Sequence, residues 1–542
     1  MKPCIIGVSL LCGVTTFVFS AVFIAPDGSD TNPGTVQEPL ESIQKAQSMV
    51  SAGDTVLIRG GIYRVRTDQI SHIEQNLFAC ISYLNKSGQT GKMIHYWAYA
   101  GETPVFDFSE IKPTNQRVVG IWVSGSYIYI KGLEMTGVQV TITSHTESYC
   151  IYSWGNHNIF ELISMHHNKG TGLRHRRGGC NLFLNCDAYL NYDDVSEDKK
   201  GSNTDGFGCH PTAGGTGNVF RGCRAWFNSD DGYDIIRSSE PVVFDSCWAF
   251  YNGYSESFSS LGDGNGFKAG GYAYDDAGQI PSPVPRNTIR FCLAVNNKAN
   301  GFYSNHHLAG NDWINNSAFR NSINYNMVNR ESVFSDNINV DGYDHLLINN
   351  LGYRARARET AYIDEALCTL ANNSFDLDTE IADEDFISLD ETLLSAPRKP
   401  DGSLPDIDFM HPAQASLLVD AGVDVGFPFV SVAPDLGAFE SGTPVQAVNL
   451  NPVMPAEMIL FPAAPNPFNP STSLYYFLQN PGWITIKILN TRGITVETLA
   501  ERFESAGYHQ LQWQPDRPVS GIYLCQLISG RSAATKKLVL VK

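Results

Sequence analysis

Four aspartates and one lysine are the residues of this chain whose types and spacing could do chemistry. Asp230, Asp231 and Asp234 lie within the segment SDDGYD, and Asp205 precedes them in NTDGFG. Lys268 follows in a glycine-rich segment, GNGFKAGG. If folding brings the carboxylates together, their charges repel and require a proton or a hard cation as partner. Four carboxylates with no interleaved His or Cys favour Ca²⁺ over zinc.

Simpler explanations exist for both parts of this set. An Asp-Asp-Gly sequence is common turn chemistry, and its charges are then solvated. A single lysine is usually a solvated surface charge, and its amine, with a pKa of about 10.4, is mostly protonated at pH 7. A neighbouring dication would favour the neutral amine, which is a competent base. The chemistry therefore depends on whether Lys268 lies beside the aspartates.

A cation next to a base amine fits the cleavage of a uronic-acid polymer. The C5–H of a uronate is acidic, and a cation on the adjacent carboxylate would acidify it further and stabilise an enolate-like intermediate. The lysine would remove this proton, and the C4–O glycosidic bond would break by β-elimination. Hydrolysis, which calls for a paired acid and base carboxylate, is one alternative. A noncatalytic adhesin that binds acidic glycans through calcium is another.

A repeat must position these residues. The pattern apolar-x-x-Cys-x-Ala-apolar-x-Asn recurs, as FLNCDAYLN at 183–191, FRGCRAWFN at 220–228, FDSCWAFYN at 244–252 and IRFCLAVNN at 289–297. Two weaker copies close at Asn168 and Asn321. The closing asparagines 168 and 191 are 23 residues apart, and the pairs 228 and 252, and 297 and 321, are each 24 residues apart. Each repeat contains short β-prone runs, and stacked repeats would place equivalent residues above one another. This pattern predicts an all-β fold, a right-handed parallel β-helix. A β-propeller or another all-β fold is the alternative, but a four-stranded propeller blade needs about 40–45 residues, which is longer than the 23–24-residue spacing found here.

The repeat predicts columns of equivalent residues along the β-helix. The asparagines would form a ladder, and Cys186, Cys223, Cys247 and Cys292 would be buried free thiols in one interior column. Although export permits disulfides, no obligatory disulfide framework is expected.

A second column predicts the geometry of the site. It reads Thr-Gly-Leu-Arg from 171, Asp-Gly-Phe-Gly from 205, Asp-Gly-Tyr-Asp from 231, Asn-Gly-Phe-Lys from 265 and Asn-Gly-Phe-Tyr from 300. If these segments align, Asp205 and Asp231 lie on neighbouring coils, and so do Asp234 and Lys268. Because the aromatic ring points inward, the next residue points outward. Lys268 and Asp234 would therefore share the outer face.

The three segments SDDGYD, NTDGFG and GNGFKAGG together resemble polysaccharide lyase family 9, the β-helical pectate lyases. The resemblance covers roughly residues 25–440. It implies a Ca²⁺ site made by Asp205, Asp230, Asp231 and Asp234, with Lys268 as the Brønsted base. It also implies an acidic polysaccharide substrate, pectate or polygalacturonate. This sequence has the family's residue type at all five of these positions.

The charge balance restricts the partners. The chain of 542 residues has a net charge of −18, which argues against a nucleic-acid partner. A polyanionic substrate needs local positive charge, and Arg237, Arg174 and Arg177, with Arg176 beside them, are the expected contacts for its carboxylates. Ordinary solvated charges are the alternative for these arginines.

The order of segments predicts an exported protein in several parts. Lys2 and the apolar run that follows it predict a signal peptide over 1–20, with no lipid anchor. Residues 21–440 are the expected β-helix lyase domain, 441–457 a linker and 458–542 a small β-sandwich. No later apolar run approaches 18 residues, so no membrane span is expected. We expect a monomer, either released outside the cell or attached to its surface.

The last domain has a resemblance of its own. PNPFNPST, the later SGIYL and the basic end resemble the C-terminal sorting domain of type IX secretion substrates. This resemblance implies the type IX secretion machinery as a partner. A carbohydrate-binding or spacer sandwich is the alternative, although no aromatic platform favours sugar binding.

Overall fold

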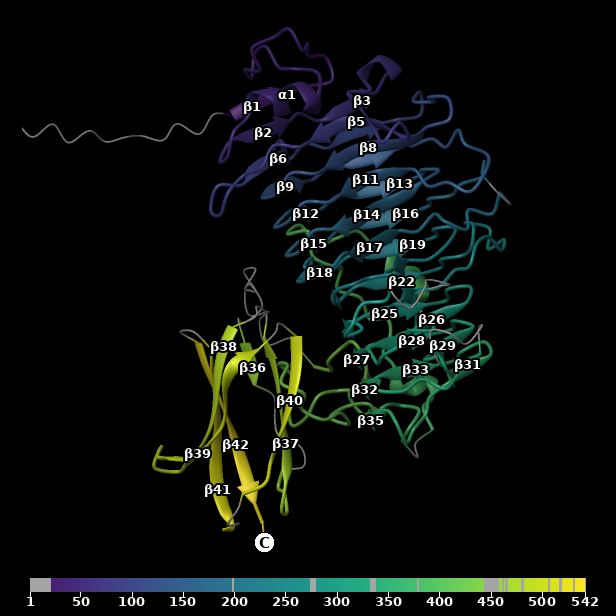
Figure 1. Ribbon diagram of the computed structural model, residues 1–542. Helices are drawn as coiled ribbons and strands as arrows, with labels where there is room; N and C mark the ends of the chain where they lie inside the picture. Colours follow the sequence, from purple (N-terminus) through teal and green to yellow (C-terminus); the bar gives the residue numbers. More distant parts are fainter. Residues whose placement is uncertain are drawn as a thin grey trace, which may run out of the picture.

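The computed structural model describes residues 21–541 except 197–198, 273–278, 332–337, 378–379, 443–457, 461–462, 464–465, 479–481, 505–506, 516–518 and 530–531. The expected signal peptide and nearly all of the expected linker lie outside the described residues. The described chain is almost entirely β, and its coils stack along one axis from the purple to the green end of Figure 1. The predicted fold class, a parallel β-helix followed by a small β-sandwich, is confirmed.

Three sheets form the sides of the β-helix, and each coil adds one strand to a sheet. The first sheet comprises β1 (Ala21–Ile24), β2 (Thr55–Ile58), β6 (Ile94–Ala98), β9 (Ile128–Lys131), β12 (Ile159–Glu161), β15 (Leu182–Leu184), β18 (Asn218–Arg221), β21 (Val242–Asp245), β24 (Thr288–Arg290), β27 (Asp312–Ile314), β32 (Leu346–Ile348) and β35 (Thr369–Ala371). The second comprises β3 (Gly61–Arg64), β7 (Pro104–Asp107), β10 (Glu134–Thr136), β13 (Ser164–His166), β16 (Asp187–Tyr189), β19 (Arg224–Trp226), β22 (Trp248–Phe250), β25 (Leu293–Val295), β28 (Ser317–Phe319) and β33 (Leu351–Tyr353).

The third sheet carries the candidate site. It comprises β4 (His72–Glu74), β5 (Phe78–Leu84), β8 (Arg117–Val123), β11 (Tyr149–Ser153), β14 (Thr171–Arg177), β17 (Phe207–Pro211), β20 (Tyr233–Asp234), β23 (Phe267–Lys268), β26 (Asn300–Tyr303), β29 (Ile323–Asn326) and β34 (Arg358–Ala361). From β5 to β34 its neighbouring strands are parallel. Two short antiparallel strands, β30 (Asn329–Arg330) and β31 (Asn339–Val340), lie outside the three sheets.

Stacked side chains fix the register of the third sheet. Phe207, Tyr233, Phe267 and Phe302 form an interior column with ring centroids 4.7–5.2 Å apart. All four rings are 1% exposed or less. Because a shift by one residue would turn these rings outward, the column specifies which residues face solvent.

The predicted asparagine ladder is present. Asn168, Asn191, Asn228, Asn252 and Asn297 are buried, and the side-chain amide of each donates to the side-chain oxygen of the next at 2.9–3.0 Å. The four predicted column cysteines are fully buried and free. The ladder satisfies polar groups at each turn and so holds the coils in line.

One end and one side of the β-helix are covered by other structure. Helix α1 (Ile43–Met49) begins after Ser42, whose hydroxyl accepts a hydrogen bond from the Lys45 amide, and it buries Ile43 and Ala46 in the main core. The irregular tail near 386–440 packs apolar side chains against the second sheet. Short 3₁₀ helices occur at Thr67–Gln69, Asp383–Asp385 and Glu391–Ser395.

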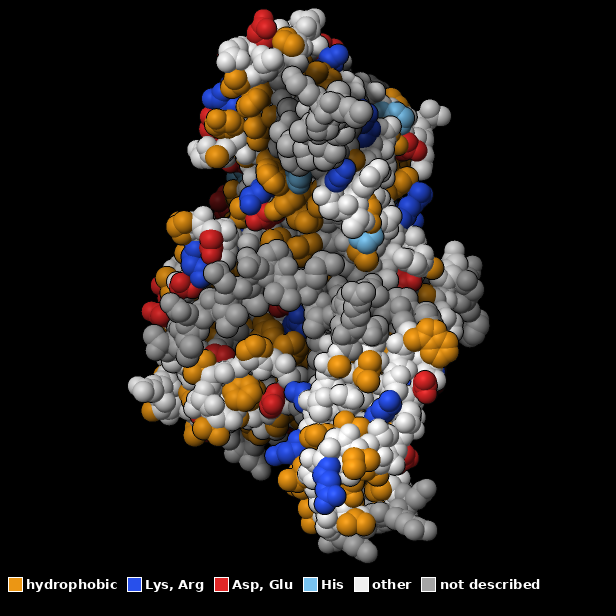
Figure 2. Space-filling view, turned by 90° about the vertical axis from the view of Figure 1, so that its left-hand side faces the viewer, with side chains coloured by type: hydrophobic (Ala, Val, Ile, Leu, Met, Phe, Trp, Pro, Cys, Tyr) orange, Lys and Arg blue, Asp and Glu red, His pale blue; other side chains and the backbone are white. Residues whose placement is uncertain are grey.

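The C-terminal module has a core of its own. One sheet contains β36 (Met458–Leu460), β37 (Thr472–Leu478) and β40 (Gly507–Trp513), and the other contains β38 (Gly482–Asn490), β39 (Thr495–Glu504), β41 (Gly521–Ser529) and β42 (Ser532–Leu540). Their apolar faces form one cluster. In the described residues, no helix has the length and apolar character needed to cross a bilayer. Hydrophobic, acidic and basic side chains are interspersed over the described parts of the face in Figure 2.

Candidate metal and lyase site

The predicted second column aligns in the structure. Tyr233 of β20 pairs with Phe207 on one side and Phe267 on the other, so that Asp234 pairs with Lys268. The amide of Asp231 donates to Oδ1 of Asp205 at 3.2 Å, which places these two residues on neighbouring coils. The sequence-based register is therefore confirmed, and its outward residues lie on one face of the third sheet.

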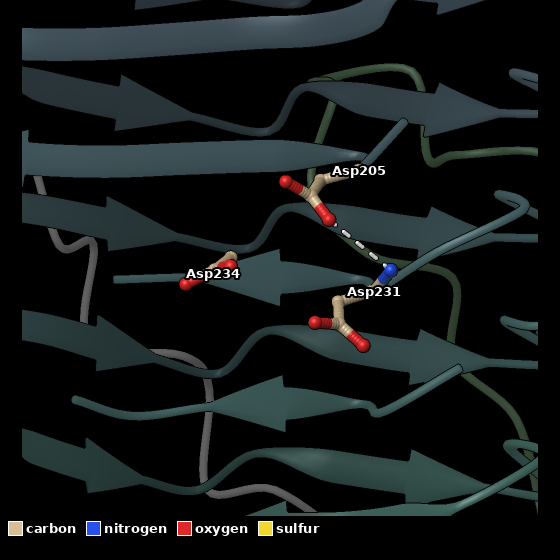
Figure 3. Close-up of side chains that lie close together, drawn as sticks. All are labelled: Asp205, Asp231 and Asp234. Carbon is tan, nitrogen blue, oxygen red and sulfur yellow. Dashed lines mark hydrogen bonds between the residues drawn. The ribbon is translucent and has the colours of Figure 1, made fainter. Parts of the chain in front are cut away.

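Three of the four predicted carboxylates meet in one group. Asp205, Asp231 and Asp234 each offer an oxygen, and these oxygens lie within 4.8 Å of one another. Figure 3 shows that Asp205 comes from one coil and that Asp231 and Asp234 come from the next, and that the three side chains occupy one small region of the sheet surface. We call these three residues the acid nest. A group of this size and chemistry suits a hard cation.

The oxygens of Asp231 have different surroundings. Oδ1 accepts hydrogen bonds from the backbone amide of Asn265 at 2.7 Å and from its side-chain amide at 2.8 Å. Oδ2 is buried and receives no hydrogen bond. Hydrogen bonds to one oxygen orient the carboxylate and leave the other available. A buried carboxylate oxygen without a donor is costly unless a cation lies beside it.

Lys268 is the cation that the chain itself supplies. Its Nζ lies 3.0 Å from Oδ2 of Asp231 and 3.1 Å from Oδ2 of Asp234. The Lys268 side chain is 14% exposed and that of Asp231 is fully buried. The amine therefore faces the nest from the same outer surface, as the register predicted.

The fourth predicted ligand, Asp230, lies beside the nest but is not one of the three grouped residues. Its Oδ1 accepts a hydrogen bond from the Asp263 amide at 2.7 Å. Burial, with repulsion from Asp231, raises the pKa of Asp230 well above its ordinary value. The exposed Asp263 also raises this pKa, so it is a further acidic residue at the site.

The nest contains more negative charge than Lys268 balances. Burial is the largest cause that raises the pKa of Asp205, and repulsion from Asp234 is the next. The pKa of Asp231 is raised by burial in spite of Lys268, whereas Lys268 and other partners outweigh burial and lower that of Asp234. Burial alone would lower the pKa of Lys268, but the combined carboxylates raise it well above its usual value. A dication would relieve this imbalance.

His210 borders the nest and has no role in the sequence-based hypothesis. Its Nδ1 lies 2.6 Å from the carbonyl oxygen of Ile236, which can only accept, so Nδ1 carries the hydrogen. The ring lies over Gly208, where an added Cβ would be 2.9 Å from Nε2. Burial and the nearby Arg174 lower the pKa of His210 to about 3. The imidazole is therefore neutral, and Nε2 is an acceptor.

The three predicted substrate arginines have different environments. Arg174 is paired with Glu147, and its Nη1 donates to the hydroxyl of Tyr149 at 3.1 Å. Burial lowers the pKa of Arg174 to about 10. Arg177 is exposed, with its guanidinium 3.7 Å from the ring centroid of Trp154. Arg237 is exposed on the turn after β20, where its backbone donates to Gly271.

Asn265 is the supporting residue that the sequence-based hypothesis missed. It lies in the aligned column beside Asp231 and holds that carboxylate through two hydrogen bonds. Its own side-chain oxygen accepts from Asn300 at 2.7 Å, and the oxygen of Asn300 accepts from Asn326 at 3.0 Å. The Asn-Gly-aromatic segments that repeat on successive coils were the available signal for this chain of amides.

Family models match most of the β-helix and part of the tail. The model described as "Pel9A-like, right handed beta helix region" matches residues 22–340. A model described as "Rhamnogalacturonan lyase-like, C-terminal" matches residues 364–426.

Two relatives are similar over most of their length. "Pectate lyase L" of Dickeya dadantii is 35% identical over 425 residues, which are 77% of this chain and 90% of the relative. "Pectate lyase PEL9" of Emericella nidulans is 27% identical over 435 residues, or 74% of this chain and 97% of the relative.

Two solved structures resemble the β-helix closely. A rhamnogalacturonan lyase is 43% identical with a TM-score of 0.71, covering 73% of this chain and 96% of the other. The crystal structure of pectate lyase Pel9A is 33% identical with a TM-score of 0.63, covering 78% and 96%.

Proposed function

The chain belongs to the Pel9A-like right-handed β-helix family and is a polysaccharide lyase, and from this premise we propose that it is a calcium-dependent pectate lyase. The substrate would be α-1,4-galacturonan, cleaved by β-elimination. The observation that carries the proposal is the pair of contacts from Lys268 Nζ to Asp231 and Asp234 on one outer face. A base amine beside a cation-binding nest is what uronate elimination requires.

Asp205, Asp230, Asp231 and Asp234 would hold the Ca²⁺ ion. Oδ2 of Asp231 accepts no hydrogen bond and has only the Lys268 amine beside it, and the pKa values of Asp205 and Asp230 are raised; both observations fit a dication at this position. A bound Ca²⁺ would neutralise the substrate carboxylate and favour the enolate-like charge that develops next to C5. Asn265 would keep Asp231 oriented throughout the reaction.

Lys268 would act as the base. Its Nζ takes the C5 proton, the electron pair forms the C4=C5 double bond, and the C4–O4 bond breaks. The leaving oxygen takes a proton from solvent, so the products are a new reducing end on the leaving side and a 4,5-unsaturated sugar. The Lys268 side chain is 14% exposed, so a polymer lying across the sheet would approach its amine from this open side.

Arg174 and Arg237 would hold substrate carboxylates near this centre, and Arg177 would contact sugars further along the polymer. Arg174 and Arg177 lie on β14, and Arg237 follows β20, so all three are on or next to the sheet that carries Lys268. Arginine binds carboxylates in a planar, two-pronged geometry. Glu147 already pairs with Arg174, so substrate would compete for that guanidinium.

A second substrate is favoured by a specific similarity. The rhamnogalacturonan lyase structure is 43% identical, compared with 33% for pectate lyase Pel9A. Rhamnogalacturonan also presents a galacturonate whose C5–H is next to a carboxylate, so the same nest and lysine would serve. The two substrates differ in the neutral rhamnose that alternates with each uronate.

A product assay on both polymers tests the proposal. Purified protein is incubated with polygalacturonate and with rhamnogalacturonan, each with Ca²⁺ and with chelator, and the products are followed by ultraviolet absorbance and mass. We expect unsaturated oligogalacturonides from polygalacturonate in the presence of Ca²⁺. Unsaturated products from rhamnogalacturonan alone would favour the second substrate. Saturated products would indicate hydrolysis, and binding without any product would indicate an adhesin.

Export would use both ends of the chain. We propose that residues 1–20 are a signal peptide, that 21–440 form the lyase domain, that 441–457 are a linker and that 458–542 are a type IX sorting domain. The support is the PNPFNPST and SGIYL pattern together with the two-sheet sandwich of the C-terminal module. Expression in a host with type IX secretion, with and without residues 458–542, tests this role by the amount of protein outside the cell.

A further inference from the structure

We infer that an aromatic and arginine patch on β5 to β14 is a distal subsite for the acidic polysaccharide, on the N-terminal side of the acid nest. The patch consists of Tyr83, Trp122, Tyr152, Trp154, Arg176 and Arg177. The inference rests on the proposed function, because it assigns the surface where that substrate extends beyond the reacting sugar. The occupant of the patch would be further uronate residues of the polysaccharide molecule that is cleaved at Lys268.

The patch continues the register of the site. Successive pairs across the third sheet join Tyr83, Trp122, Tyr152, Arg174, Gly208, Asp234 and Lys268. Neighbouring strands lie about 4.8 Å apart, so Tyr152 on β11 is about 19 Å from Lys268 along the β-helix axis. A chain that lies along this axis with one sugar at Lys268 would therefore reach the patch after several more sugars.

The aromatic rings make a rigid base. Trp122 packs edge-to-face against Tyr152 at 4.5 Å and against Trp154 at 4.6 Å between ring centroids. Trp122 is fully buried and Tyr152 is 3% exposed, whereas Tyr83 and Trp154 are half-buried at the surface. His72 packs against Tyr83 and Arg177 lies over Trp154, and the parts of these two rings that stay exposed offer apolar surface that suits the C–H groups of sugars.

Several donors in this region have no acceptor. The indole Nε1 atoms of Trp122 and Trp154 and the Nε of Arg117 are buried and receive no hydrogen-bond partner. Such donors are rare in folded proteins because leaving them unsatisfied is costly. The indole N–H of Trp122, which is fully buried and has no acceptor, is the independent sign that a ligand or ordered solvent completes this patch.

The charge of the patch fits a polyanion. Arg176 and Arg177 are exposed, and among the described residues neither guanidinium lies in an ion pair. Arg177 stacks over Trp154, which holds its guanidinium flat at the surface. In a protein of net charge −18, exposed arginines on a coil that precedes the nest provide the local attraction that a polyuronate needs.

The main test compares long and short substrates. The Arg176→Ala/Arg177→Ala double variant is assayed on polygalacturonate and on the shortest galacturonan oligomer that the wild type cleaves. We expect the ratio of kcat/KM on the polymer to kcat/KM on the oligomer to fall by about tenfold, since two exposed charge contacts are removed only from the longer substrate. Because both side chains are exposed, the variant should fold, and its Tm checks this.

Arg358→Ala is the control for a general charge effect. Arg358 is exposed on β34, which is three strands beyond β23, just as β14 is three strands before it. This variant removes one positive charge at the same strand separation, but on the side without the aromatic patch. We expect the polymer-to-oligomer ratio to stay within twofold of wild type. An equal loss in Arg358→Ala would show a nonspecific charge effect and overturn the subsite.

A binding measurement separates the subsite from the chemistry. In a Lys268→Ala background, calorimetry with polygalacturonate should show affinity about tenfold weaker when Arg176 and Arg177 are also replaced. Arg177→Lys should recover only part of this loss, because lysine keeps the charge but not the planar stack on Trp154. If the wild type cleaves polygalacturonate but replacing Arg176 and Arg177 changes neither the polymer-to-oligomer ratio of kcat/KM nor the affinity for polygalacturonate, the inference is overturned. A wild type that cleaves neither polymer would instead overturn the proposed function.

Discussion

Two buried charged clusters lie on different sheets of the same β-helix, and they balance their charge in opposite ways. On the second sheet, Asp187 accepts from Arg224 at 2.9 Å and from Arg398 at 2.7 Å, so one carboxylate has two arginine partners. On the third sheet, the acid nest has several carboxylates and one amine, Lys268. The first cluster is balanced within the chain, and the second has an excess of negative charge that a further cation would balance.

The contacts around the two clusters and the pKa values of their carboxylates differ in agreement with this charge balance. Arg398 comes from the irregular tail and also donates to the carbonyls of Cys186 and Gly222, so it fastens the tail to the β-helix. The arginines outweigh burial and lower the pKa of Asp187. In the nest, burial raises the pKa of Asp205 instead. The comparison indicates that one charged cluster stabilises the fold, and it supports the proposal that the other holds a cation.

The largest difference between the clusters should appear in metal binding. Asp231→Asn removes a negative oxygen from the centre of the nest, so we expect Ca²⁺ affinity to fall at least about 100-fold, with a comparable loss of activity at limiting Ca²⁺. Asp187→Asn is the control and should leave Ca²⁺ affinity within twofold. Calorimetric Ca²⁺ titration of both variants checks this, and equal losses in the two would erase the distinction.

Stability should show the reverse order. Asp187→Asn leaves Arg224 and Arg398 buried without a carboxylate, and we expect it to lower the free energy of unfolding by about 3–5 kcal/mol. Asp231→Asn, measured in chelator, should lower it by much less, because it also removes repulsion. Urea unfolding of the two variants measures both values. A larger loss for Asp231→Asn would mean that the nest is a structural cluster.

A neutral polar column provides a third reference. Asn252→Ala deletes a fully buried ladder member that bonds to Asn228 and Asn297 and leaves their amides partly unsatisfied. We expect a loss of about 2 kcal/mol in unfolding free energy. Ca²⁺ affinity should not change. If activity falls more than stability predicts, the ladder also determines the alignment of the nest.

The smallest expected effect is an opposite pH dependence. A carboxyl whose folded pKa is raised, such as Asp205, contributes stability below its unfolded pKa that is lost as pH rises through the folded value. Asp187, with a lowered pKa, contributes stability above its unfolded pKa that is lost as pH falls through the folded value. In chelator, Asp205→Asn should therefore stabilise the protein more at pH 7 than at pH 4. Unfolding of wild type and variant at both pH values tests the sign.

The two clusters were not equally predictable from sequence. The nest follows from segments that repeat on successive coils, because Phe207, Tyr233 and Phe267 must stack inside and so direct the next residue outward. The Asp187–Arg398 contact joins positions that are 211 residues apart, and the tail carries no repeat that would indicate its path. Nor did the sequence reveal that Asp230 lies outside the closest group of three, since adjacent residues on a turn point in different directions.

Supporting contacts were also beyond the sequence-based hypothesis. Asn265 was visible in the aligned column, but its role depends on hydrogen-bond geometry to Asp231. The aromatic patch was hidden because its rings come from coils with weak repeats. The position of Arg174 was predicted, but its partner Glu147 lies in a loop between strands.

The most direct measurement is the rate at which Lys268→Ala forms ultraviolet-absorbing product from polygalacturonate at saturating Ca²⁺. We predict a kcat about a thousandfold below wild type, which is within the range that a positioned general base supplies, with Ca²⁺ affinity retained. A variant that binds Ca²⁺ normally and keeps the full rate would contradict it, because the amine facing the nest would then have no part in removing the proton.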